Sequence, residues 1–397
     1  MNIRNVLGLS KNVKNLGWVS FFNDASSEMI YPLLPLFLTQ VLGSGVVFVG
    51  VIEGIAESIS SFLKLFSGWV SDRFRRRKGL ILLGYGLASI TRPFIGMATA
   101  ASQILFLRSF DRVGKGIRSS PRDALLSQSC QESERGMAFG FQRAMDHAGA
   151  MAGPLIAAFL LSVFTTNLRI VFLLSFIPAL FCLLVLFRGV TERAGTSHSP
   201  RSSSFKLRWE DWDKRFKAFL LIITLFTLGN SSDAFLLLRA KDLGIDTVSI
   251  PILWFLFHLS KAAFSIPGGA ISDRIGRKRV MIAAWMLYGL VYLGFAFSSE
   301  AYHIWVLFFV YGLFFGLSEG TERAWVADLV EASRRGMAYG AYHFAIGVAA
   351  LPASLLMGLI WKTAGVAWAF SFGAFMALLA ALLAIILMRA SPAPRKS

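Results

Sequence analysis

The sequence predicts an all-α membrane protein whose twelve transmembrane helices form two six-helix, pseudo-symmetric halves around a central cavity. Of the 397 residues 55% are hydrophobic and only 16% are charged, which is too little polar surface for a soluble protein of this size. Apolar stretches of roughly 20 residues, each long enough to span a bilayer as a helix, recur along nearly the whole chain. A short cassette also occurs twice, about half a chain apart, and this indicates duplication.

The twelve predicted helices follow one another with short connections. Helices are expected because backbone groups in lipid must form their hydrogen bonds within the segment itself. The expected spans are 15–41, 45–71, 79–99, 102–129, 136–163, 169–189, 217–240, 248–273, 280–298, 302–330, 337–362 and 366–389.

The positive charges alternate between successive connections. Lys and Arg cluster at 11–14, 73–78, 201–217, 274–279, 334–335 and 395–396, whereas the loops near 41–46, 98–102 and 298–303 carry almost none. This pattern predicts a multi-pass protein of the bacterial inner membrane with both termini in the cytoplasm. The formal charge of +17 would usually suggest a nucleic-acid partner, but its placement favours anionic lipid headgroups, so we expect membrane lipids and no nucleic acid.

One stretch divides the chain. Residues 190–216 interrupt the apolar pattern, so we expect an N-terminal six-helix bundle at 1–189, a cytoplasmic linker at 190–216 and a C-terminal six-helix bundle at 217–397. Within the linker, Phe205, Trp209, Trp212 and Phe216 recur at helical spacing with charges between them. This spacing predicts an amphipathic helix in the inner membrane interface.

Three short motifs repeat between the halves. The cassette reads GWVSDRFRRRK at 68–78 and GAISDRIGRKR at 269–279, RGMAFG at 135–140 recurs as RGMAYG at 335–340, and SSE at 26–28 recurs as SSD at 231–233. Internal repetition of this kind is typical of secondary transporters, whose halves rock around a site near the middle of the membrane.

These motifs resemble the major facilitator superfamily over essentially the whole chain. The cassette is similar to the superfamily's cytoplasmic signature between helices two and three, repeated between eight and nine, although Arg75 replaces a glycine that the second copy keeps at Gly276. Arg112 with Gly116 resembles the fourth-helix Arg-x-x-x-Gly element. The spacing of Gly140, Gly149, Gly153 and Pro154 resembles the fifth-helix signature of the drug/proton antiporter branch. Ala157 and Ala158 stand where that signature usually has glycines.

The resemblance implies a role for each motif. The cassettes would form a conformational latch on the cytoplasmic side, in which an aspartate faces the N-terminus of a neighbouring helix and the arginines hold the loop. The alternative is that the arginines only mark the inside. The latch residues are Gly68, Asp72, Arg73, Arg76, Gly269, Asp273, Arg274 and Arg277.

The resemblance also implies a bend in helix five that limits leak of ions through the transporter; an ordinary small-residue helix contact is the alternative. The residues of that bend are Gly149, Gly153 and Pro154.

Ionisable residues inside the predicted helices are candidates for proton coupling. Such groups are costly in a membrane and usually face a cavity or a partner. Asp24 and Glu28 lie four residues apart on one helix face, where two carboxylates repel each other, so they are the first candidates. Glu57 and Asp146 come next. The alternative for each residue is a static buried ion pair that fixes helix packing.

Other charged and histidine residues of the two halves are candidates for the substrate cavity. Basic groups on the fourth helix could hold an anionic or zwitterionic solute, unless the carboxylates of the first two helices already neutralise them. The candidates are Arg112, Lys115, Arg118, Arg143, Asp233, His258, Glu319, Glu322, Arg323 and His343.

The sequence therefore predicts a secondary active transporter that works by alternating access and couples protons to the export of a small organic molecule. One alternative is a proton symporter that takes up an organic anion or zwitterion, and another is a membrane receptor or scaffold without transport. The sequence contains no P-loop, zinc motif or nucleophile elbow, and Cys130 and Cys182 lack metal-ligand spacing. We thus expect a monomer that is not an enzyme and needs no cofactor or metal.

Overall fold

The computed structural model describes residues 9–74, 77–131, 135–192, 212–331 and 335–387. Every regular element in these ranges is helical. The elements group into twelve passes, six before the segment at 193–211 and six after it, and this confirms the predicted twelve-helix architecture.

The first half contains passes one to six. The first pass is divided into α2 (Lys11–Ile30), η1 (Tyr31–Leu33), α3 (Leu34–Leu36) and η2 (Phe37–Val41). Pro32 and Pro35 lie at this division, and a proline nitrogen carries no hydrogen for helical bonding. The next five passes are α4 (Val46–Phe74), α5 (Arg77–Ile95), α6 (Ala101–Gln128), α7 (Arg135–Val163), and α8 (Leu168–Leu174) followed by α9 (Phe176–Gly189).

The second half repeats this plan. Its first pass is broken between α10 (Lys214–Gly229) and α11 (Ala234–Asp242). The remaining passes are α12 (Ser249–Ile275), α13 (Arg277–Phe297), α14 (Ala301–Asp328), α15 (Arg335–Ala364) and α16 (Val366–Leu387). Helices α13, α14 and α15 each begin 200 residues after α5, α6 and α7, so the two halves correspond residue by residue over these three helices.

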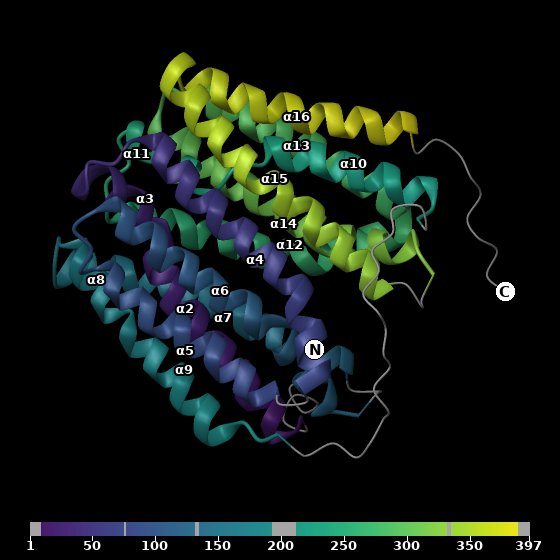
Figure 1. The fold of residues 1–397 in the computed structure, drawn as a ribbon. Helices are drawn as coiled ribbons and strands as arrows, with labels where there is room; N and C mark the ends of the chain where they lie inside the picture. The colour runs from purple at the N-terminus through teal and green to yellow at the C-terminus, as the bar shows by residue number, and fades with distance from the viewer. Residues whose placement is uncertain (1–8, 75–76, 132–134, 193–211, 332–334, 388–397) are drawn as a thin grey trace.

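The two halves lie side by side, with the purple and blue helices in one and the green and yellow helices in the other (Figure 1). The first residue of α2 and the last residue of α16 lie at the same end of the bundle, which we call the termini end; we call the opposite end the far end. The far-end connections at 42–45, 96–100, 164–167, 243–248 and 298–300 contain no Lys or Arg. The structure therefore gathers the loops that lack positive charge at one end of the bundle.

Nine of the described passes are long and apolar enough to cross a membrane by composition alone. The exceptions are the first, third and fourth passes, which contain α2, α5 and α6. These helices carry buried polar side chains, including Asn23, Arg92, Arg108 and Asp111, so the polarity that lowers their hydropathy faces protein instead of lipid.

The halves contact each other closely along α4 and α15. A Cβ atom at Gly54 would lie 2.9 Å from the Cα of Leu351, and one at Gly358 would lie 2.9 Å from the Cα of Val47. Ser58 Oγ donates a hydrogen bond of 2.7 Å to the carbonyl of Gly347. Glycines at these positions let the two backbones approach without side chains between them.

Most of the predicted linker helix lies outside the described residues. Of its four aromatic residues, the structure describes Trp212 and Phe216, and Phe216 belongs to α10. Their rings lie 4.8 Å apart and both side chains are buried in the core of the second half. At these two positions the aromatic side chains pack against protein, in place of the membrane interface that the sequence predicted.

Candidate functional site

A buried chain of four charged residues holds the first half together. Arg108 Nη2 lies 2.8 Å from Glu53 Oε2, Arg108 Nη1 lies 3.7 Å from Asp111 Oδ2, and Arg92 Nε lies 3.0 Å from Asp111 Oδ1. None of the four side chains is more than 7% exposed. Two acids and two bases balance each other, and together they join α4, α5 and α6, so we call this set the charged network.

Sequence reasoning missed Arg92 in this network. Its guanidinium also donates a hydrogen bond of 2.9 Å to the carbonyl of Asn23, which ties α5 to α2. The available signal was an arginine inside an apolar stretch, next to Pro93. Glu53 and Arg108 form an ion pair with each other, so each neutralises the charge of the other within the first half.

Glu28 lies at the contact between the halves. Trp254 Nε1 on α12 donates a hydrogen bond of 2.8 Å to Glu28 Oε2, and His258 Nε2 lies 3.8 Å from the same oxygen. The ring of Tyr31 lies 5.2 Å from that of Trp254. Both imidazole nitrogens of His258 are buried and have no hydrogen-bond partner among the described residues. We call Glu28, Trp254 and His258 the inter-half clasp.

Asp24 lies one turn before Glu28 on α2 and is close to Asp146 on α7. Asn23 Nδ2 donates to Asp24 Oδ1 at 2.7 Å, and Gln142 Nε2 donates to Asp146 Oδ2 at 2.7 Å. The two carboxylates interact electrostatically across the contact of α2 with α7. The structure thus brings three of the four predicted proton-coupling residues, Asp24, Glu28 and Asp146, to one neighbourhood.

The predicted fifth-helix motif forms this same contact. Helix α7 continues without interruption through Pro154. A Cβ atom at Gly153 would lie 2.5 Å from the carbonyl oxygen of Ala25, and one at Gly149 would meet the carbonyl of Phe21. The glycines therefore let α7 lie directly against the backbone of α2 beside Asp24 and Glu28.

Two cations on α6 lie near Glu57, the fourth proton-coupling candidate. Arg112 and Lys115 are one turn apart and interact electrostatically with Glu57 and with each other. The Nε atom of Arg112 is buried without a hydrogen-bond partner among the described residues. Within the described ranges, neither Arg112 nor Lys115 has a recorded ion pair. These two side chains can therefore receive an anionic group.

Arg118 lies elsewhere. Its guanidinium lies 4.5 Å from the centre of the Tyr85 ring on α5, and the residue is 5% exposed. This side chain belongs to the contact between α5 and α6.

Glu319 gathers three cations nearer the termini end. Its carboxylate lies 2.9 Å from Lys261 Nζ, 3.4 Å from Arg323 Nη2 and 3.7 Å from Arg143 Nη2, and Arg143 belongs to the other half. Two further predicted cavity residues lie where α14 meets α15: Glu322 of α14 interacts with the hydroxyl of Tyr342 on α15, and the ring of His343 lies 5.1 Å from that of Tyr342.

The second cassette binds within its own half. Arg277 lies 3.5 Å from Asp273 and 3.1 Å from Asp328 at the end of α14, and the Asp273 side chain is 70% exposed. Gly276, at the turn from α12 to α13, has a φ of +95°, a conformation that favours glycine. Exposed Arg274 follows Asp273, and among the described residues no atom lies within 4 Å of a Cβ built at Gly269. The side chains of 65–76, which include Gly68, Asp72, Arg73 and Arg76, lie outside the described part of the structure.

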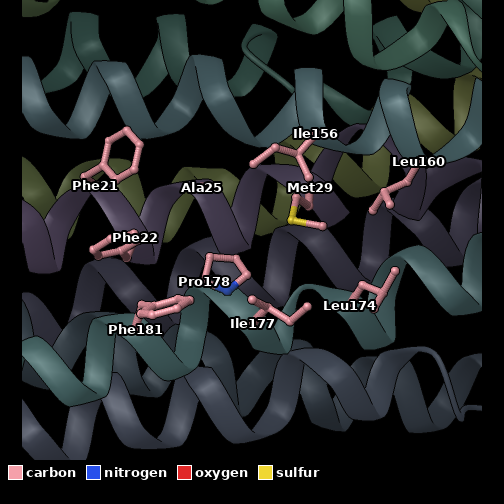
Figure 2. A pocket seen from close by; sticks show the side chains of 10 residues that line it. All are labelled: Phe21, Phe22, Ala25, Met29, Ile156, Leu160, Leu174, Ile177, Pro178 and Phe181. Carbon is pink, nitrogen blue, oxygen red and sulfur yellow. The ribbon is translucent and has the colours of Figure 1, made fainter.

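An apolar groove opens on the first half between α2, α7 and the α8–α9 pass (Figure 2). Phe22, Met29, Ile156 and Phe181 are among its ten lining residues, and none of the ten is charged. This composition fits contact with lipid. The lining of the groove therefore includes none of the charged groups between the halves.

Comparison with known proteins agrees with this architecture. The family model described as "Major Facilitator Superfamily" matches residues 16–238 and 218–397. An uncharacterized MFS-type transporter of Methanocaldococcus jannaschii is 36% identical over 97% of both chains. The multidrug resistance protein MdtG of Dickeya zeae is 25% identical over 75% of both chains.

Solved structures share the fold. The POT family transporter PepTSo has a TM-score of 0.78 at 13% identity and covers 96% of this chain and 98% of its own. The family resemblance that the repeated motifs predicted is confirmed. The chain therefore belongs to the major facilitator superfamily and is a multi-pass membrane transporter, not an enzyme.

Proposed function

We propose that this protein exports a small organic molecule in exchange for protons, and that the inter-half clasp couples the two movements. The observation that carries the proposal is the position of Glu28. Its carboxylate belongs to the first half, yet its recorded partners include Trp254 and His258 of the second half. A change of protonation here changes how strongly the halves attract each other.

The clasp suggests how one proton would act. When His258 is protonated and Glu28 is ionised, opposite charges lie 3.8 Å apart and close the far end. At an effective dielectric constant of about 20 the attraction is about 4 kcal/mol. Loss of the proton leaves neutral His258 and only the hydrogen bond from Trp254, so the halves separate more easily at the far end. Asp24, one turn away, is the nearest group on α2 that can pass the proton on.

Direction and orientation rest on two further observations. The far-end loops at 42–45, 96–100, 164–167, 243–248 and 298–300 lack Lys and Arg, which favours cytoplasmic termini and an external far end in the inner membrane. A relative at 25% identity is named a multidrug resistance protein, which favours export. Arg277 holds both Asp273 and Asp328 within the second half, and the Asp273 side chain is 70% exposed, so it can meet the other half when the termini end closes, as a latch requires.

A second candidate is proton-coupled uptake of an organic anion. Arg112 and Lys115 favour it because neither has a recorded ion pair in the described ranges and Arg112 Nε is buried without a partner. A carboxylate or phosphate on a substrate would add a second negative charge beside that of Glu57.

Liposome flux separates these candidates. The purified protein is reconstituted with a pH-sensitive dye inside, and cationic dyes and small organic anions are supplied as probes with and without a pH gradient. Opposite movement of probe and protons supports export, parallel movement supports uptake, and probe flux without proton flux contradicts coupling.

Matched variants test the residues. Asp24→Asn combined with Glu28→Gln should abolish proton movement, because the acid that passes the proton on and the counter-charge of protonated His258 are both lost. Glu331→Gln, at an exposed acid in the connection before α15, should leave it unchanged. Unaltered proton flux in the double variant would remove both residues from the coupling step.

A further inference from the structure

A single acid occupies the break in the seventh pass. Asp233 lies between α10 and α11, directly before the first residue of α11. Tyr311 Oη on α14 donates a hydrogen bond of 2.6 Å to Asp233 Oδ1. Two tyrosines of α13, Tyr288 and Tyr292, stack beside it with their ring centres 4.2 Å apart. The carboxylate is therefore set among aromatic side chains.

Two hydroxyls in this surrounding are unsatisfied. The oxygens of Tyr292 and Ser231 are buried and have no hydrogen-bond partner among the described residues. Tyr292 is 0% exposed and Ser231 is 5% exposed. Buried hydroxyls are nearly always bonded, so each of these two oxygens can still accept a hydrogen bond from a further donor.

In the corresponding region of the first half, arginines neutralise the negative charges of the acids. Because α13 and α14 begin 200 residues after α5 and α6, Tyr292 stands where the first half has Arg92, and Tyr311 stands where it has Asp111. The second half thus replaces an ion pair of the charged network with two tyrosines. Asp233 has no recorded ion pair among the described residues.

The charged groups that face Asp233 do not supply a free counter-charge. Lys261 on α12 interacts with it electrostatically, but that ammonium lies 2.9 Å from Glu319. Glu28 on α2 and Glu53 on α4 also act on it, and both are negative. Tyr31 of η1 adds a neutral hydroxyl. An ionised carboxylate without a counter-charge is costly in a membrane interior, so the site favours uptake of a cation.

We propose that Asp233 takes up a second coupling proton, in the second half and separate from the inter-half clasp. This inference rests on the proposed proton coupling and adds a second site to it. The proton binds Oδ2, since Oδ1 already accepts from Tyr311, and the new O–H supplies a donor for the hydroxyl cluster. A proton adds no volume to a site whose tyrosine rings are already stacked at 4.2 Å.

Carbodiimide labelling tests the proposal without a known substrate. Dicyclohexylcarbodiimide reacts with protonated carboxyls in apolar surroundings: the acid proton moves to a carbodiimide nitrogen and the carboxyl oxygen bonds to its central carbon, giving after rearrangement a stable N-acylurea. The full-length protein in liposomes is labelled over a range of pH, and the modified peptides are quantified by mass spectrometry.

The expected result is labelling at Asp233 that increases as the pH falls. Asp233→Asn should remove this label and keep the labels on α2. Tyr311→Phe should increase labelling about tenfold at a pH where the native protein is sparsely labelled, because a hydrogen bond to the ionised form is worth about 1.5 kcal/mol. Tyr302→Phe, at a tyrosine that is 64% exposed, is the matched control and should change nothing.

Two results would overturn the proposal. One is an Asp233 peptide that stays unlabelled at every pH at which Asp24 or Glu28 is labelled. The other is labelling that sodium suppresses and choline at the same ionic strength does not, since the occupant would then be a metal cation. Failure of the proposed function is read separately, from the labels on Asp24 and Glu28 and from the flux assay.

Discussion

The hydrogen bond from Trp254 to Glu28 should hold the far end of the transporter closed. Trp254→Phe removes the indole N–H and keeps an aromatic ring beside His258, so the change isolates that bond. A hydrogen bond to a charged acceptor contributes about 1.5–3 kcal/mol. Its loss should shift the equilibrium toward the far-end-open state by about 10- to 100-fold.

The shift is large enough to observe directly. If the open state is populated at about 1% in the native protein, it should rise to about 10–50% in the variant. Spin labels at Ser44 and Ser299, in far-end connections of the two halves, report the separation by double electron–electron resonance. Cys130 and Cys182 are first replaced by alanine so that only these two positions carry a label.

A matched substitution controls for the loss of an indole. Trp368→Phe changes a tryptophan that is 68% exposed, and it should leave the distance distribution unchanged. If Trp254→Phe also leaves the distribution unchanged, the clasp does not hold the halves together. An equal shift in both variants would refute the reasoning as well, because the effect would then not depend on Glu28.

Three further perturbations follow from the same contacts. His258→Gln should increase the far-end-open population in the same spin-label measurement, because a neutral amide cannot form an ion pair with Glu28. Arg108→Leu should lower the melting temperature sharply, since breaking a buried pair costs about 3–5 kcal/mol; adding Glu53→Leu should restore part of the loss in thermal denaturation. Gly54→Val should force α4 from α15 and widen the far-end distance, whereas Gly86→Val, where a Cβ has open space, should not.

The sequence predicted the helices well because the bilayer sets their length. The expected span at 102–129 is α6 at Ala101–Gln128, and the one at 280–298 is α13 at Arg277–Phe297. The interruptions at Ser175 and before Asp233 were not predicted. The break at Ser175 lies inside an apolar run and leaves its hydropathy unchanged, whereas the polar NSSD stretch at 230–233 was the available signal for the second break.

The candidate site was predicted in part. Glu28 stood out because an acid inside a membrane helix is rare, but Trp254 did not, because a tryptophan there looks apolar. Arg118 was grouped with Arg112 because both lie on one helix. Only the packing of α6 against α5 shows that Arg118 turns toward Tyr85.

The repeated motif that ends in Glu28 and Asp233 shows how two copies of one element can acquire different tasks. Glu28 reaches across to α12, so its charge acts on the contact between the halves. Asp233 is held by Tyr311 of its own half. The first half retains a neutral set of paired charges, while the second half has tyrosines at two of those positions. A proton bound within the inter-half clasp would therefore change the position of the halves, whereas one bound at Asp233 would mainly change the charge stored in the second half.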